Sequence, residues 1–437
     1  MQMMSMMFLL CSIIFITIIF FKIHKRGKNN NTPPSPPGLP LIGNLHQLGR
    51  HTHRSLCSLS RRYGPLMLLH FGRVPVLIVS SAEVAKEVLK THDRVFASRP
   101  RSKIFEKLLY DRHDVASAPY GEYWRQMKSV CVLHLFSNKM VRSFREVREE
   151  EISLMMEKIR RSSSLPVNLS KILMSLTNDV ICRVALGRKY GGETDFQELM
   201  ERDRNDFVDV LLSIQREKSV GFEIDRVSVK AIVLNVFVGG TETSYTLMEW
   251  AMTELIRHPK CMNRLQEEVR TICKGKSCVS EEDIQEMKYL KAVIKETMRL
   301  HPPLPLMIPH ESTQDVRLGD YHIPAGTQVL INAWAIGREA ATWGPDAEDF
   351  RPERHLDLSV DYRGQSFELI PFGAGRRICP AISFAVVLNE IVLANLVHRF
   401  DWRLPTESIE NQTGIAESFG TSVHCKFPLY VIASSTT

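Results

Sequence analysis

The residues with the clearest chemical potential lie late in the chain, around Cys379. They read Pro-Phe-Gly-Ala-Gly-Arg-Arg-Ile-Cys-Pro over 371–380, and an apolar run that favours a helix follows over 381–397. A cysteine at or just before a helix N-terminus suits a thiolate, because the helix dipole stabilises negative charge there. Gly373 and Gly375 allow a tight turn whose N–H groups can point at the sulfur. The pattern predicts a thiolate metal ligand, with two arginines placed to bind carboxylates beside the metal.

Two simpler interpretations of this loop compete. A buried cysteine before a helix is usually a small apolar filler. A nucleotide loop would need a third glycine where Ile378 stands. The complete string Phe-x-x-Gly-x-Arg-x-Cys resembles the haem-binding loop of the cytochromes P-450, the haem-thiolate monooxygenases. The resemblance implies that Cys379 is the axial ligand of a haem b iron, in a cofactor-binding loop with Phe372, Gly375 and Arg377.

A second motif pairs Glu296 with Arg299. Their i,i+3 spacing puts both charges on one helix face. A solvated surface pair is the simple alternative, and such pairs contribute little to stability. The motif resembles the family's Glu-x-x-Arg helix, which implies a buried pair joined by Arg354 from the segment 350–355. A buried charge triad is costly unless every partner is present, so breaking it should be severe.

The run over 226–258 looks like one long helix whose centre is apolar almost all round, and we expect that centre to be internal. The two adjacent glycines at 239–240 cost roughly 1 kcal/mol each in a helix interior. They mark either close packing or a kink, which Thr243 can widen by bonding back to a carbonyl. By resemblance this is the oxygen-binding groove, where Thr243 and Glu242 are catalytic residues that manage protons.

Trp124 and Lys128, four residues apart, face the same way on a predicted helix. They resemble the family's Trp-x-x-x-Arg helix, which implies contact with a haem propionate. A surface aromatic beside a basic residue is the simple alternative. Lys128 replaces the expected arginine, keeping its charge but losing its bidentate geometry. His310 stands where the family usually has an arginine on a propionate, and it is a weaker, pH-dependent substitute.

The N-terminal residues 1–21 carry no charge and are mostly Met, Phe, Leu and Ile. At about 1.5 Å per residue, a helix of this length just spans a bilayer. Four basic residues follow within 22–28, and such positive flanks stay cytosolic. A cleaved signal peptide is the alternative, but there the positive charge precedes the apolar run. We expect a single-pass anchor in the endoplasmic reticulum membrane, a basic and proline-rich hinge over 22–40, and a cytosolic body.

The remaining residues, 41–437, suit one large α-rich catalytic domain. The nine cysteines show no paired spacing and no Cys-x-x-Cys, which fits a reducing compartment. The net charge of +7 is modest, and no basic patch is interleaved with aromatic residues, so nucleic-acid binding is a poor interpretation. Basic residues near the cysteine side would suit docking of an acidic electron donor, by resemblance an NADPH–cytochrome P-450 reductase. The candidates are Arg125, Lys128, Lys139, Arg142 and Arg145, although each could belong to a solvated face.

One part of the family pattern is missing. Members carry two helices and a loop, called here the roof helices, that cover the substrate cavity between segments matching Tyr190 and Asp206. This chain has only the short polar stretch 191–205 there, so we expect an internal deletion or a mis-spliced gene model. Loss of the roof helices should admit water to the distal haem face, whereas such sites normally exclude it.

These observations predict a mostly α cytochrome P-450 fold with a small β lobe, preceded by a transmembrane helix. The pattern is closest to the plant A-type group, in the subfamily with indole-acetaldoxime dehydratases and triterpenoid oxidases. The function expected is oxidation of a small apolar specialised metabolite with O2 and electrons from NADPH. An aldoxime dehydratase-type lyase on the same fold and an inactive truncated relative remain alternatives. The expected cavity walls are 102–118, 234–243, 304–308 and 419–420.

Overall fold

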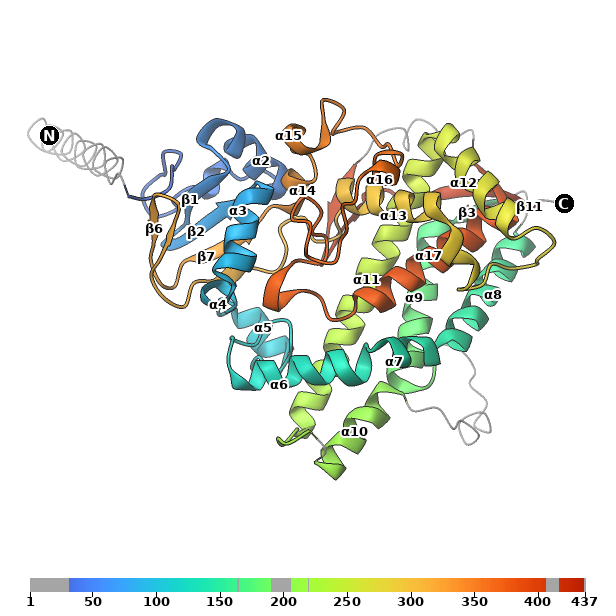
Figure 1. The fold of residues 1–437 in the computed structure, drawn as a ribbon, viewed down its shortest axis with the longest axis horizontal. Coiled ribbons are helices and arrows are strands. Elements are labelled where there is room, and N and C mark those ends of the chain that lie inside the picture. The colour runs from blue at the N-terminus through green and yellow to red at the C-terminus, as the bar shows by residue number, and fades with distance from the viewer. Residues whose placement is uncertain (1–30, 163–164, 190–205, 219, 406–415, 436–437) are drawn as a thin grey trace, which may run out of the picture. The chain divides into compact units, whose positions relative to one another are not determined.

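The computed structural model describes residues 31–162, 165–189, 206–218, 220–405 and 416–435 (Figure 1). The predicted transmembrane helix over 1–21 and the junction over 191–205 lie outside the described residues. The chain divides into two compact units. One comprises Met1–Pro100 and Leu306–Glu339, and the other comprises Arg101–Pro305 and Ala340–Thr437.

The first unit is built on a small mixed sheet with the strand order β1-β2-β7-β4. Strands β1 (Leu66–Phe71) and β2 (Val74–Val79) form a hairpin that turns at Gly72, whose φ is +64°. β2 then pairs in parallel with β7 (Gln328–Ile331), and β7 pairs with β4 (His310–Glu311). The other elements of this unit are η1 (Leu45–Gln47), α2 (Thr52–Tyr63), α3 (Ala82–Lys86), η2 (Glu87–Thr91), α4 (Asp93–Phe96), β5 (Val316–Leu318), β6 (Tyr321–Ile323) and α14 (Ala333–Ile336).

The second unit is mostly helical. Its helices are α5 (Lys103–Leu108), α6 (Glu122–Val130), η3 (Cys131–Leu135), α7 (Asn138–Ser143), α8 (Arg145–Arg161), α9 (Leu169–Leu186), α10 (Phe207–Glu217), α11 (Arg226–Arg257), α12 (Pro259–Ile272), η4 (Asp283–Glu286), α13 (Lys288–Leu300), α15 (Ala340–Trp343), α16 (Arg354–Asp357), η5 (Gly375–Arg377) and α17 (Ile382–Arg399). Its strands are β3 (Pro166–Asn168), β8 (Phe400–Arg403), β9 (Glu417–Phe419), β10 (Val423–Cys425) and β11 (Tyr430–Ser435). β3, β11 and β8 form one sheet, and β9 pairs with β10. The prediction of a mostly α fold with a small β component is confirmed.

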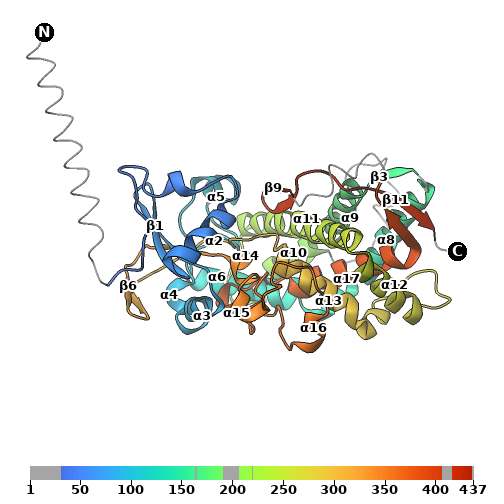
Figure 2. The same cartoon turned by 90° about the horizontal axis from the view of Figure 1, so that it is seen from above.

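The long helix α11 is the axis of the second unit, because α9, α10, α12, α13, α17 and strand β10 all contact it (Figures 1 and 2). Its first turn is capped by Asp225, whose side chain accepts a hydrogen bond from the Ser228 N–H. The helix bounds agree with the predicted run over 226–258. The prediction that its apolar centre is internal is partly wrong, since Val238 is 45% exposed. Burial is continuous only from Ser244 to Leu255, apart from a half-buried Thr253.

Within the residues that the structure describes, one helix is long and apolar enough to cross a membrane, and it is α17. Most of that helix, 67% of the apolar window, is buried inside the protein, and α8, α11, α12 and α13 pack against it. A core helix of a folded domain has these properties, so α17 is accounted for by packing.

Candidate functional site

The loop before α17 is a tight turn built on two glycines. Gly373 and Gly375 have φ values of +74° and +65°, a region that other residues rarely adopt. The Cys379 N–H donates to the Phe372 carbonyl at 3.0 Å, which closes the loop on itself. Because α17 begins at Ile382, the loop presents Cys379 just outside the helix N-terminus.

The Cys379 thiol is only partly exposed, and burial raises its pKa. A hydrogen bond from the Ala381 N–H and the positive charge of Lys128 both act in the opposite direction. Lys128 also donates from Nζ to the carbonyl of Ile378, the residue before the cysteine. One lysine of α6 therefore contacts the loop and favours negative charge on its sulfur.

The predicted cofactor-binding residues of α6 and of the loop meet in one cluster. The Arg377 guanidinium lies over the Trp124 ring, 4.2 Å from its centroid. Arg377 donates to the carbonyls of Val115, at 3.2 Å, and Ala118. The Trp124 ring N–H donates to the same Val115 carbonyl at 3.0 Å. Helix α6, the segment 115–118 and the cysteine loop are thus held together by a stacked Trp–Arg pair.

Two further predicted residues belong to the loop, and one lies in the other unit. Phe372 packs edge-on against Tyr362 with ring centroids 5.9 Å apart, and Gly375 is exposed. His310 is buried in β4, where its Nδ1 lies 2.8 Å from the Phe96 carbonyl. Contact of His310 with a propionate stays a prediction.

The two adjacent glycines of α11 differ in their surroundings. A Cβ on Gly240 would lie 2.6 Å from Cδ1 of the buried Ile181 on α9, so this glycine marks close packing. A Cβ on Gly239 would meet nothing within 4 Å. Thr243 donates from Oγ1 back to the Gly239 carbonyl at 2.6 Å, the back-bonding predicted for this helix. Gly239 therefore keeps one side of α11 open beside the Thr243 hydroxyl.

Glu242 has a partner that sequence reasoning missed. Its Oε1 accepts hydrogen bonds from the Ser422 N–H, at 3.0 Å, and the Ser422 hydroxyl, at 3.1 Å. Ser422 lies in the turn between β9 and β10, 180 residues away in sequence. No spacing rule connects a helix residue with a turn so distant, and only the fold brings them together.

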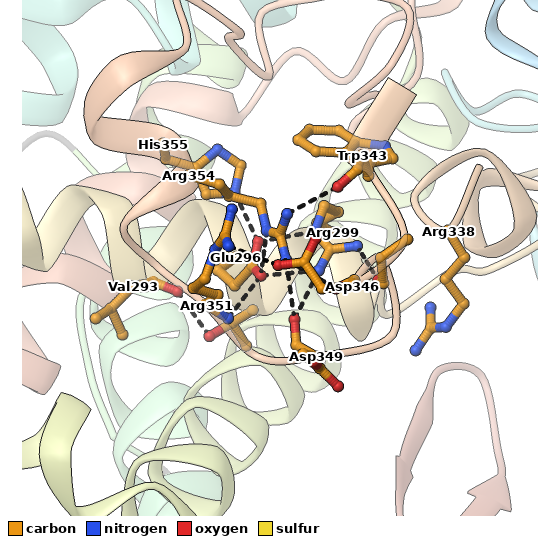
Figure 3. Close-up of polar contacts among 12 residues, drawn as sticks. Val293, Glu296, Arg299, Arg338, Trp343, Asp346, Asp349, Arg351, Arg354 and His355 are labelled. Atoms are coloured by element: carbon orange, nitrogen blue, oxygen red, sulfur yellow. Dashed lines mark hydrogen bonds and ion pairs between the residues drawn. The ribbon is translucent and has the colours of Figure 1, made fainter. Parts of the chain in front are cut away.

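The predicted charge triad meets in a fully buried network (Figure 3). Glu296 accepts from Arg299 Nε at 2.7 Å and from Arg354 Nε at 2.9 Å. His355, which sequence reasoning missed, adds a third contact at 2.8 Å. Arg354 also donates to the Trp343 carbonyl at 3.0 Å.

The electrostatics of this network follow from its hydrogen bonds. Burial alone would raise the pKa of Glu296, but the bonds from Arg299 and His355 hold it at about 2. Burial lowers the pKa of His355. The carboxylate therefore stays charged and fully paired, and the network fixes α13 to the segment 343–355.

A third missed residue is Arg99, in the first unit. It is buried, and its guanidinium donates to the carbonyls of Ile308 at 2.6 Å and Pro309 at 2.9 Å. The available signal was an arginine two residues after the apolar Ala97. Arg99 orders the segment that leads into His310.

The donor set around Cys379 fits a haem. Among the described residues, no group of three or more His, Cys, Asp or Glu side chains could hold a bare metal ion. One thiolate suffices for an iron whose other ligands come from a macrocycle. Lys128 and Arg377 supply positive charge suited to the carboxylates of haem b.

A protein-family model described as "Cytochrome P450" matches this chain in two segments, residues 33–202 and 193–420. The segments overlap within the junction over 191–205. Cytochrome P450 71A26 of Arabidopsis thaliana is 76% identical over 489 aligned positions, which cover 100% of both chains. That alignment includes all 437 residues of this chain. It therefore has 52 positions (489 less 437) at which the relative has a residue and this chain has none.

Other relatives agree. Cytochrome P450 71A22 of Arabidopsis thaliana is 70% identical over 490 positions and also covers 100% of both chains. Among solved structures, a zebra fish cytochrome P450 with abiraterone aligns with a TM-score of 0.76 and 27% identity. The match covers 88% of this chain and 99% of that one.

Proposed function

Because this chain belongs to the cytochrome P450 family, a family of haem-iron monooxygenases, we propose that it oxidises a small apolar specialised metabolite. The oxidant is O2, and the electrons come from NADPH through a membrane reductase. When bound, haem supplies the electron-accepting and oxygen-activating chemistry. The observation that carries the proposal is the cluster of Cys379, Lys128, Trp124 and Arg377.

The cysteine loop is the part of the chain that would hold haem. Cys379 would ligate the iron, presented by a turn whose φ values at Gly373 and Gly375 other residues rarely adopt. Lys128 and Arg377 would bind the haem carboxylates, with Trp124 stacked beside Arg377.

Residues of α11 handle protons. Thr243 holds its hydroxyl over the open side of the helix at Gly239, where a substrate can approach. Glu242 serves as the acid that exchanges protons on the open side of the helix beside the Thr243 hydroxyl. General acid–base groups of this kind contribute about 10²–10⁴-fold to rate.

An acidic reductase would dock on the face that carries α6 and α7. Arg125, Lys139 and Arg142 are exposed there. Arg145 is already engaged, because its guanidinium pairs with Glu149 at 2.7 Å and with Glu282. The first three residues are therefore the better candidates for docking. We also place the protein in the endoplasmic reticulum membrane with a cytosolic body, on the uncharged run 1–21 and its basic flank.

A second candidate function is that of a truncated relative with little or no activity. Exposed apolar side chains lie on three of the predicted cavity walls, namely Ile104 and Leu108, Val238, and Phe419. Together with the two overlapping family segments and the 52 unmatched positions, they support the absence of the roof helices.

The experiment that tests the proposal compares the wild-type chain with Cys379→Ala. Reduced wild-type protein treated with carbon monoxide should absorb at the thiolate position, and the variant should not. An identical spectrum in both would remove Cys379 as the ligand. Product analysis with and without NADPH then separates a monooxygenase, which needs NADPH, from a dehydratase-type lyase, which does not.

A further inference from the structure

A polar seam joins one face of α11 to the hairpin of β9 and β10. The Trp250 ring N–H donates to the Val423 carbonyl at 3.0 Å, and the Cys425 N–H donates to Glu249 at 3.1 Å. Helical spacing places the Trp250 and Glu249 side chains on one face with three others. The face comprises Glu242, Thr246, Glu249, Trp250 and Thr253.

The directions of the hydrogen bonds at the Glu242 end of the seam are fixed. A carboxylate can only accept, so the Ser422 hydroxyl donates to Glu242 Oε1. The hydroxyls of Thr246 and Ser422 lie 2.8 Å apart, and the Thr246 hydroxyl must therefore donate to Ser422. Both residues are fully buried, with exposures of 0% and 1%, so water does not compete.

The turn also leaves room for the carboxylate. A Cβ on Gly420 would lie 3.0 Å from Glu242 Oε1 and 3.3 Å from Cε1 of His424. Such contacts are tighter than most that real side chains make, so a larger residue at position 420 would push Glu242 aside. Gly420 and Ser422 thus form a cradle for one carboxylate oxygen. Among the described residues, Oε2 of Glu242 has no hydrogen-bond partner.

We propose that Ser422 is a positioning residue for Glu242. Its N–H and hydroxyl hold Oε1 against the turn, and this leaves Oε2 free to exchange a proton beside Thr243. The inference rests on the proposed function only for the proton exchange, since the cradle itself is defined by contacts. Phe419, which is exposed, ends the strand that leads into the same turn.

The cradle is tested without turnover by hydrogen–deuterium exchange of the Ser422 amide. Glu242→Ala removes the acceptor of that N–H, so exchange should become faster on the order of tenfold or more. The matched control is Thr253→Val, which removes the contact with Cys425 and the bond back to the Glu249 carbonyl, both at the far end of the seam, and should leave the Ser422 amide unchanged. Equal exchange in wild type and Glu242→Ala would overturn the cradle.

The positioning role is tested on the full-length, haem-loaded enzyme. Ser422→Ala should lower the product formed per NADPH on the order of tenfold, a fraction of the effect of an acid–base group, and should change its pH profile while KM stays the same. Ser422→Thr, which keeps the hydroxyl, should restore both. Thr246→Val, which leaves the Ser422–Glu242 contact in place, should behave as wild type.

The outcomes separate the two ideas. A Ser422→Ala enzyme with wild-type coupling and an unchanged pH profile would overturn the positioning role. If the wild-type chain makes no product at all, the proposed function fails, and the amide exchange still decides whether Ser422 holds Glu242.

Discussion

Arg354 donates from Nε to Oε1 of Glu296 at 2.9 Å, although 58 residues of sequence separate them. Oε1 also accepts from the Arg351 backbone N–H at 2.9 Å (Figure 3). The segment 343–355 has little regular structure, so its position depends on bonds of this kind. The buried carboxylate therefore organises a loop that secondary structure does not.

Replacing Arg354 should lower the free energy of unfolding more than replacing a charged residue on the surface. Arg354→Met leaves Glu296 short of one charged partner and the Trp343 carbonyl without its donor, so we expect a loss of about 3–5 kcal/mol. Urea unfolding measures it. The matched control is Arg351→Met, whose side chain is 54% exposed and pairs with Asp346, and which should cost less than about 1 kcal/mol. Equal losses in the two variants would contradict this account.

Stability should depend on pH through Glu390 of α17. Burial raises its pKa to about 7, and the charges of Lys291, Arg363 and Lys295 only partly oppose this. The unfolded chain releases that proton at its ordinary pKa of 4.5. The folded state therefore loses stability as pH rises from about 4.5 to about 7, by roughly 3 kcal/mol at most.

The Glu390→Gln variant should remove this loss. It should gain stability over wild type between pH 5 and pH 8 in thermal unfolding. Asp320→Asn, at a side chain that is 96% exposed, serves as the control and should keep the wild-type slope. If Glu390→Gln also keeps that slope, Glu390 is not the titrating group.

The two glycines of α11 should respond in opposite ways to alanine. Gly239→Ala meets open space and gains helix propensity, so we expect a stabilisation of up to about 1 kcal/mol. Gly240→Ala forces the buried Ile181 to move, which should cost about 1–3 kcal/mol before the same gain is counted. Thermal unfolding of the two variants side by side is the measurement. A less stable Gly239→Ala protein would mean that something covers this side of the helix.

The topology proposed for the N-terminal anchor can be checked in sealed microsomes. Added protease should digest the body, because four basic residues follow the uncharged run 1–21. Asn168 and Asn411 head glycosylation sequons and should carry no sugar. A protected body, or sugar at either asparagine, would reverse the topology.

Restoring the roof helices should improve the stability, haem retention and coupling of the protein. We expect the 437-residue chain to retain haem weakly and to couple NADPH use poorly to product, because Val238 and Phe419 are exposed apolar side chains on two of the predicted cavity walls. Inserting the corresponding segment of a close relative at 191–205 should raise stability, haem retention and coupling together. Tightly coupled turnover by the unmodified chain would show that other residues cover the predicted cavity.

The sequence alone predicted those structural features whose determinants are local in the chain. The glycines of the cysteine loop, the helix over 226–258 and the back-bond of Thr243 follow from neighbouring residues. Trp124 and Arg377 were each assigned to the cofactor site only through the family resemblance, and their contact was not predicted, because α6 and the loop are about 250 residues apart in the chain.

Sequence reasoning failed where long-range contacts decide. Ser422 belongs to no motif, and His355 ends the segment 350–355 without a predicted role, so each acquires its role from a carboxylate that the fold brings beside it. The centre of α11 was expected to be internal because it is apolar almost all round. Composition does not tell which neighbouring elements cover a helix, and Val238 is exposed.

Helix α17 has a consequence for how the protein is made. Its 18 residues are apolar enough to enter a bilayer, so this surface is hidden only once α11, α12 and α13 pack around it. Asn389, Glu390 and Asn395 are buried in the fold but would be expensive in lipid. The buried Glu390 carboxyl thus weakens the folded state at neutral pH, and it would also make this helix costly to place in lipid.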